Sequence, residues 1–189
     1  GVRCGEDRLG RRAGGAQTEF TKGQMNFLAG QTHLQNNSFQ AAYIRFLDGV
    51  RLYPSSYDSY QGLVVLVEAG VPVDEFQRGL VNFNAKSYLP AIAAFNRIIE
   101  ANPTSYREDL HLYLAWSYEG LGDMSNALDQ IAQYQAISMT TAAPGLIEKG
   151  KLLVRACENA AALAAYREFM DTMHQEPQAV DAAWWVAVL

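Results

Sequence analysis

Acidic side chains are the leading candidates for catalysis in this sequence, because two carboxylates on either side of a substrate can act as acid and base. Glu108 and Asp109 are adjacent, whereas Glu100 and Glu119 stand alone. Ser105 precedes Glu108 by three residues, which is the S-x-x-E pattern of a capping box at the start of a helix. We therefore assign Glu108 to a helix start. The sequence predicts no catalytic residue, and we do not expect this chain to be an enzyme.

Histidines and cysteines, the residues that most often bind transition metals, are also not spaced for chemistry. His33, His111 and His174 include no two that are four residues apart, the spacing that places two ligands on one face of a helix. Cys4 and Cys157 have no further metal ligand beside them. We expect no metal site and no disulfide framework. We also expect no cofactor, since no glycine-rich phosphate loop is present.

Charge and hydropathy exclude two classes of partner. The chain of 189 residues has a net charge of −5, and its pI is about 5.2. Nucleic acid is therefore not expected as a partner, because binding phosphates requires a basic surface. No run of 18 apolar residues is present, so no transmembrane segment is expected. The chain begins with Gly1 and ends in an apolar run, from which we expect it to be a fragment of a longer protein.

The sequence divides into a short tail and one long helical region. Residues 1–22 are rich in glycine and arginine and lack apolar periodicity, which predicts a disordered or artificially added tail. Residues 23–189 carry apolar side chains at helical spacing and predict at least seven helices and no sheet, in a domain truncated at its C-terminal end. The valine-rich run 63–67 is assigned to a helix because no partner strand is present.

Local signals set the expected helix boundaries. A second, weaker capping box is expected at Ser55 and Asp58, and residues 138–145 are expected to form a turn. The expected N-caps are Ser38, Ser87, Asp123 and Asn159, and the expected helix ends are Gly70, Gly122 and the residues before Pro103.

One pattern of apolar spacing recurs along the helical region. Its small residue is Ala42, Ala91, Ala127 and Ala165 in the four copies, which are 49, 36 and 38 residues apart. A large residue follows four positions later in each copy, namely Phe46, Phe95, Ile131 and Phe169. Helix pairs that repeat at a nearly fixed period indicate a solenoid, in which each pair covers the apolar face of the next.

With these residues in view, the chain resembles the tetratricopeptide repeat family. Gly30, Gly79 and Ala115 match the small residue of the first helix of each repeat, although Asn26, Glu75 and His111 stand where that family carries tryptophan. The resemblance implies an all-α fold, a right-handed superhelix of antiparallel helix pairs. An extra helix is expected around residues 56–70 and interrupts the regular pairing. This irregularity resembles the superhelical domains of bacterial soluble lytic transglycosylases, and that group is the alternative resemblance.

The resemblance also implies a binding groove. Residues of each first helix line this groove in the repeat family, and the groove candidates among the matching positions here are Gln31, Gln35, Asn84, Asp109, Trp116 and Glu119. They would bind a protein or peptide partner, with a peptidoglycan strand as the alternative ligand. The competing interpretation is that Trp116 faces a packed interior and not a groove.

Two functional hypotheses follow from the resemblance. The first is a non-catalytic helical-repeat scaffold for a protein partner, in the bacterial periplasm or cell envelope, with the cytoplasm as the alternative location. The second is the superhelical arm of a peptidoglycan lytic transglycosylase whose catalytic domain lies beyond Leu189. Trp184 and Trp185 belong to the last helix and predict self-association through it.

Overall fold

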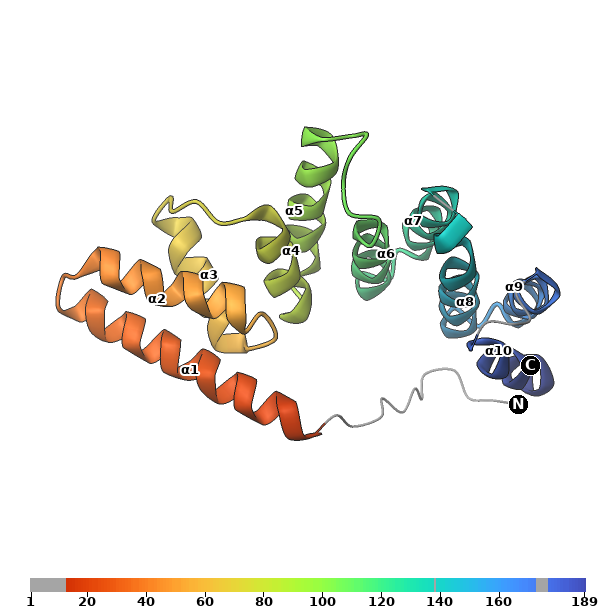
Figure 1. Ribbon diagram of the computed structural model, residues 1–189, viewed down its shortest axis with the longest axis horizontal. Coiled ribbons are helices and arrows are strands. Elements are labelled where there is room, and N and C mark those ends of the chain that lie inside the picture. Colours follow the sequence, from red (N-terminus) through yellow and green to blue (C-terminus); the bar gives the residue numbers. More distant parts are fainter. Residues whose placement is uncertain (1–12, 138, 173–176) are drawn as a thin grey trace. The chain divides into compact units, whose positions relative to one another are not determined.

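The computed structural model describes residues 13–137, 139–172 and 177–189, all of whose regular structure is α-helical (Figure 1). This confirms the all-α prediction and the prediction of at least seven helices. The ten helices are α1 (Ala13–Gln35), α2 (Phe39–Leu52), α3 (Tyr57–Glu68), α4 (Glu75–Asn84), α5 (Tyr88–Ala101), α6 (Leu110–Gly120), α7 (Met124–Ile137), α8 (Met139–Arg155), α9 (Asn159–Thr172) and α10 (Ala179–Val188).

The first helix begins earlier than the expected start near Gly23. Helix α1 starts at Ala13, while Gly23 is the first buried residue in the part of α1 whose burial is described, which begins at Thr18. A methyl group at Gly23 would overlap the Ser56 side chain, so packing against the start of α3 fixes this part of α1. A helix extends beyond its packed part at low cost, because each added residue forms one more hydrogen bond. The expected tail before Ala13 lies outside the described residues.

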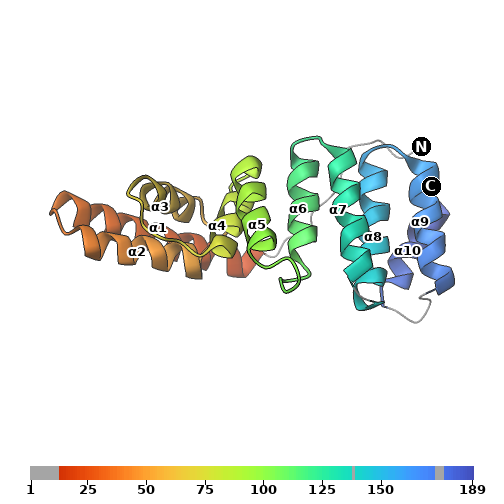
Figure 2. The same ribbon diagram turned by 90° about the horizontal axis from the view of Figure 1, so that it is seen from above.

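The chain forms two compact units, which we describe separately. One unit ends at Tyr106 and contains α1 to α5, where α1, α2 and α3 pack on one another and α4 packs on α5. The other unit runs from Arg107 to Leu189, and its helices α6 to α10 each pack on the next one along the chain. Figure 2 shows α6, α7, α8 and α9 as neighbouring antiparallel helices within this second unit.

Each helix pair is closed by a contact between a small and a large residue. A methyl group at Gly30 would overlap the ring of Phe46, and one at Gly79 would overlap the ring of Phe95. These glycines are the small residues predicted from the sequence. Without a Cβ they let the two helix backbones approach closely. The predicted small residues of the second helices, Ala42, Ala91 and Ala127, are all fully buried.

The fourth copy of the pattern is shifted by three residues from its predicted register. The glycine that touches a ring there is Gly150, and its partner is Tyr166. Ala162, four residues before Tyr166, is therefore the structural counterpart of Ala127, and it follows Ala127 by 35 residues. The predicted residue Ala165 is also buried, because α9 packs on both α8 and α10 and so has a wide apolar face.

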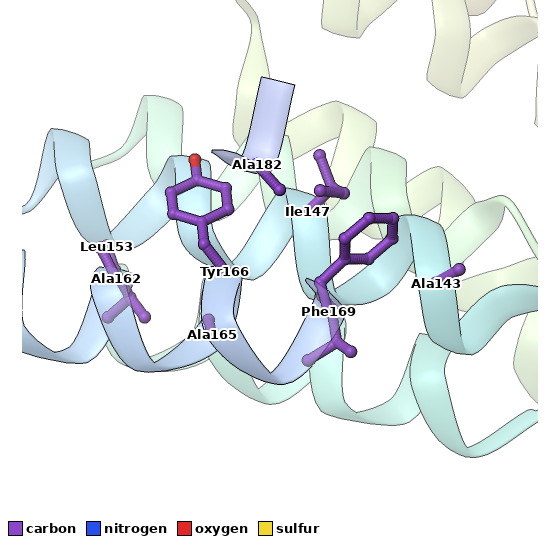
Figure 3. Close-up of a cluster of buried hydrophobic side chains, with 9 residues drawn as sticks. Ala143, Ile147, Leu153, Ala162, Ala165, Tyr166, Phe169 and Ala182 are labelled. Carbon is purple, nitrogen blue, oxygen red and sulfur yellow. The ribbon is translucent and has the colours of Figure 1, made fainter. Parts of the chain in front are cut away.

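The core of the second unit gathers where α8, α9 and α10 meet, and Figure 3 shows Tyr166 and Phe169 projecting from the same helix into it. Trp185 of α10 stacks on Tyr166, with ring centroids 6.0 Å apart and planes 2° from parallel. The buried members of this cluster are Ala143, Leu146, Ile147, Leu153, Ala162, Ala165, Tyr166, Phe169 and Ala182.

Helix α3 is the extra helix expected between two regular pairs. It includes the valine-rich run 63–67, so the assignment of this run to a helix is confirmed. Leu63 and Leu66 are buried in a common cluster with Phe46 of α2. The hydroxyl of Ser59 donates to the carbonyl of Gly49 at 3.0 Å, which ties α3 to α2 inside this core.

Several predicted helix caps are wrong in detail. Helix α6 begins after Asp109, so the predicted box of Ser105 and Glu108 lies before the helix, and no side-chain cap bond is made there. Asp109 is held instead by Arg107, whose guanidinium donates two hydrogen bonds to it, of 3.0 and 2.7 Å. The predicted box at Ser55 and Asp58 is also wrong, because the residue before α3 is Ser56. Ser38 and Ser87 do occupy N-cap positions but make no side-chain cap bond.

Other boundaries agree with the sequence. Asp123 caps α7 through a hydrogen bond from the backbone N–H of Asn126 at 3.1 Å. Gly70 and Gly122 have φ angles of +67° and +79°, as expected for glycines at helix ends. Helix α5 ends at Ala101, just before Pro103.

Residues 139–145 of the turn expected at 138–145 are instead the start of α8, which contains Pro144, and Ser138 lies outside the described residues. Thr141 and Ala143 are buried, and we attribute the helix here to this packing, which outweighs the proline signal. Asn159 is the first residue of α9 and not its cap. Cys157 is disulfide-bonded, contrary to the expectation, and Cys4 lies outside the described residues.

Candidate functional site: the α6–α8 face

The first three predicted groove residues belong to the unit that ends at Tyr106. Gln31 and Gln35 lie one turn apart on α1, and both are exposed to solvent. Asn84, at the end of α4, is also exposed, and its side-chain amide donates to the carbonyl of Pro54 at 3.2 Å. The other three, Asp109, Trp116 and Glu119, belong to the second unit, where a denser set of polar contacts surrounds them.

Trp116 on α6 is half-buried and is oriented by two neighbours. Its indole N–H donates to a carboxylate oxygen of Glu148 on α8, with Nε1 and Oε2 3.1 Å apart. The ring of Tyr113 meets it edge-on, with centroids 5.6 Å apart. Trp116 therefore has a fixed ring plane without being fully enclosed, as expected of a tryptophan whose apolar body and polar N–H face different surroundings.

Glu119, one turn after Trp116, makes the second link between α6 and α8. The guanidinium of Arg155 donates to both of its carboxylate oxygens, and the Nη2–Oε2 distance is 3.1 Å. The Arg155 side chain is 33% exposed and the Glu119 side chain 22%, so this ion pair is shielded from solvent only in part. A bidentate pair of this kind fixes both side chains in direction as well as distance.

A second ion pair completes the surface. Lys151 lies one turn after Glu148 on α8, and its ammonium donates to the other carboxylate oxygen of Glu148 at 2.8 Å. Glu148 thus holds Trp116 with one oxygen and Lys151 with the other. We call the surface formed by Trp116, Glu119, Glu148, Lys151 and Arg155 the α6–α8 face.

Asp109, the remaining predicted residue, lies just before α6 and raises the pKa of Arg107, mainly by accepting its hydrogen bonds. Burial, followed by the charge of Asp109, raises the pKa of the Tyr113 hydroxyl. Burial is also the main reason why the pKa of Tyr134, on α7, is raised, with the carboxylates of Glu108, Asp109 and Glu148 acting in the same direction. Carboxylates on α8 and in the residues before α6 therefore all raise the pKa of the same tyrosine on α7.

Sequence reasoning found one side of this face and missed the other. Trp116 and Glu119 were predicted, whereas Glu148, Lys151 and Arg155 were not. Their spacing of three and four residues puts them on one side of α8, and this signal was available in the sequence. Which helix they would face depended on the packing of α8 beside α7, and the sequence predicts a turn where the first residues of α8 lie.

The described residues carry no arrangement suited to metal chemistry, since they contain no group of three side chains that could hold a metal ion. His111 is buried, with its Nδ1 2.8 Å from the Gln130 side-chain oxygen, so it joins α6 to α7. His33 lies in the last turn of α1, and His174 lies outside the described residues. No helix in the described part of the chain is both long and apolar enough to cross a bilayer.

Comparison with known proteins gives one informative match. No family model matches the chain, and no solved structure matches it. A curated protein of Pasteurella multocida strain Pm70, named outer membrane protein assembly factor BamD, is 33% identical over 104 residues. The match covers 54% of this chain and 35% of the relative, so it extends over about a third of that protein.

The helix pairs and this match together support a tetratricopeptide-like helical repeat. The relative is named as an assembly factor, which gives no support to the resemblance to lytic transglycosylases. The match likewise supports neither a peptidoglycan ligand nor self-association. In the last helix, Trp184 is exposed while Trp185 is packed on Tyr166, so only part of the apolar surface predicted there is open.

Proposed function

We propose that this chain is a non-catalytic helical-repeat scaffold that binds a protein partner through the α6–α8 face, in the bacterial envelope. The observation that carries the proposal is the half-buried Trp116, held by Glu148 and bordered by charges of both signs. Tryptophan and arginine are enriched among the residues that dominate binding energy at protein interfaces. A ring that is already oriented loses little conformational entropy when a partner covers it.

The charges of the face favour a polypeptide as the ligand. Glu148 with Lys151 and Glu119 with Arg155 form two pairs that each carry no net charge. An anionic ligand such as a phosphate would have to compete with the carboxylates for the same cations. A polypeptide can instead add hydrogen bonds at the rim of the face and place an apolar side chain on Trp116.

The match to an outer membrane protein assembly factor supports the envelope as the setting. It also favours a protein over a glycan as the partner, because that relative is named for assembling proteins. The lytic transglycosylase alternative predicts that a catalytic domain follows this chain, and the present comparisons do not favour it.

Photocrosslinking in cells that produce the protein tests the proposal. A photoreactive amino acid at Lys151 is expected to capture a specific envelope protein, whereas one at the exposed Ala132 of α7 is expected not to. Replacing Trp116 by Ala should remove the product at 151, while Trp116→Phe should retain part of it. Equal products at both positions, or none at 151, would contradict the proposed face, and a purely cytoplasmic partner would contradict the setting.

Two further measurements keep this test interpretable. Thermal melting of Trp116→Ala separates a binding role from a packing role, because truncation of a core tryptophan costs about 3–5 kcal/mol. A loss of that size would indicate that Trp116 is core. Clearing of a cell-wall suspension by the purified chain would contradict the non-catalytic function.

A further inference from the structure

A second surface of the molecule has the features of a binding site and is independent of the α6–α8 face. A cavity of about 340 Å³ opens between α2 and the start of α4, within the unit that ends at Tyr106. Its lining comes from Ile44, Leu47, Asp48, Val50 and Arg51 of α2, and from Val73, Asp74 and Gln77 at the start of α4.

The walls of this cavity are mainly branched aliphatic side chains. Val50 is buried in the core at one end of the apolar lining, while Ile44 is 59% exposed. Leu47 and Val73 are partly buried against the same core cluster. The apolar lining is thus continuous from the core to the solvent, which is the form of a slot for one apolar side chain of a ligand.

The charged residues at the cavity favour a ligand that carries positive charge. Asp48 and Asp74 are both part of the lining, and the only cation in it, Arg51, is 3.2 Å from Asp48. The lining therefore has one more carboxylate than cations. This arrangement disfavours phosphate or carboxylate ligands and favours lysine or arginine next to the apolar anchor.

We propose that this cavity binds an extended segment of a partner polypeptide, which inserts one aliphatic or aromatic side chain between α2 and α4. A lysine or arginine next to that side chain lies against Asp48 and Asp74. The slot selects the apolar side chain of the segment, and the carboxylates select the basic residue beside it.

Selection from a phage library of random peptides on the purified chain tests the proposal. The enriched peptides should share an apolar residue beside a basic one. Ile44→Asp should weaken their binding by about tenfold or more, as expected for loss of an anchor contact. Leu52→Asp is the matched control, since Leu52 is an exposed apolar residue on the same helix outside the cavity lining, and it should bind the peptides as the parent does.

A second variant separates binding from stability. Asp74→Asn keeps a side-chain oxygen for the N-cap bond to the Gln77 N–H but removes the charge, so it should weaken peptide binding with little change in the melting temperature. A lower melting temperature with unchanged peptide binding would show that the charge of Asp74 is structural. Trp116→Ala should leave these peptides bound, so failure of the proposed function and failure of this site are distinguishable.

The remaining outcomes also decide the question. If no peptide is enriched over the Ile44→Asp chain, or if the enriched peptides bind that variant equally well, the cavity is not a peptide site. If the parent is a dimer in sedimentation and Ile44→Asp is a monomer, the occupant is a second copy of the chain, and the proposal is wrong.

Discussion

Gly79 on α4 faces the ring of Phe95 on α5 so closely that even one methyl group would overlap it. The two residues are sixteen positions apart, and the same separation joins Gly30 to Phe46 and Gly150 to Tyr166. In the remaining pair, Ala115 and Ile131 stand at the equivalent positions in one buried cluster. In this pair alanine stands in place of the smaller glycine, and isoleucine stands in place of the larger aromatic residue.

This contact predicts that Gly79→Ala destabilises the protein, although alanine is the better helix former. The overlap with Phe95 is expected to cost about 1–3 kcal/mol, which exceeds the helical gain of about 0.5–1 kcal/mol. Gly49→Ala is the control, because a methyl group there would lie 3.4 Å from the Ser59 hydroxyl, an ordinary contact. Chemical denaturation should show a loss for the first variant and no loss for the second, and equal behaviour would refute the contact.

Ala91→Glu on α5 should be among the most destabilising single changes. Ala91 is fully buried, so the substitution introduces an unpaired charge and extra volume at a cost of about 3 kcal/mol or more. Ala93 is exposed on the same helix, and Ala93→Glu should change the free energy of unfolding by less than about 0.5 kcal/mol. Melting temperatures of the two variants check this, and a parent-like Ala91→Glu would place Ala91 outside the core.

The helix caps offer a direct comparison of two side chains. Asp123→Ala removes the bond to the backbone N–H of Asn126 and should cost about 1 kcal/mol. Ser87 occupies the N-cap position of α5 without a cap bond, so Ser87→Ala should cost less than about 0.5 kcal/mol. Urea titrations at neutral pH measure both values. A larger loss at Ser87 than at Asp123 would mean that Ser87 does cap its helix in solution.

The ion pair of Glu119 and Arg155 should contribute only modestly to stability. Both side chains are partly exposed, so a double-mutant cycle of Glu119→Gln and Arg155→Gln is expected to give a coupling of about 0.2–1 kcal/mol. The coupling should shrink at about 1 M salt, where the screening length falls to about 3 Å. A coupling that is insensitive to salt would indicate a drier site than the structure has.

Stability should fall at alkaline pH. The folded-state pKa values of Tyr113 and Tyr134 are raised above the ordinary value of 10.0, so the folded chain holds these protons more tightly than the unfolded chain. Their contribution is present below about pH 10 and is lost as the pH rises through the raised values. Urea denaturation across this range should show a steeper loss for the parent than for Tyr134→Phe. Identical slopes would show that Tyr134 is not perturbed.

The helix pairs could be predicted from sequence because burial repeats along the chain. Ala91 and Phe95 are buried where their spacing placed them, since this spacing alone decides which face of α5 is apolar. The register of the last copy could not be fixed in this way. Helix α9 has two apolar neighbours, so Ala162 and Ala165 both fit a buried position and only the contact of Gly150 with Tyr166 decides between them.

The candidate site could be predicted only in part, because it depends on contacts between helices. The resemblance to the repeat family identified Trp116 and Glu119, but their partners lie 32 and 36 residues further along the chain. Predicting Glu148 and Arg155 required the start of α8, where burial of Thr141 and Ala143 outweighs the signal of Pro144. The cavity between α2 and α4 could not be predicted from the sequence, because the apolar residues that line it have the same helical spacing as residues of the core.

The sixteen-residue separation of the glycine–ring contacts has a consequence for how fast the chain folds. Each contact closes a short loop, and chains dominated by such local contacts cross a low entropic barrier and fold in about microseconds to milliseconds. Three of the four helix pairs carry their own copy of this contact, so structure can nucleate at several places along the chain and propagate from each. We expect no single nucleus, with substitutions at Phe46, Phe95 and Tyr166 each slowing refolding by a fraction of their effect on stability.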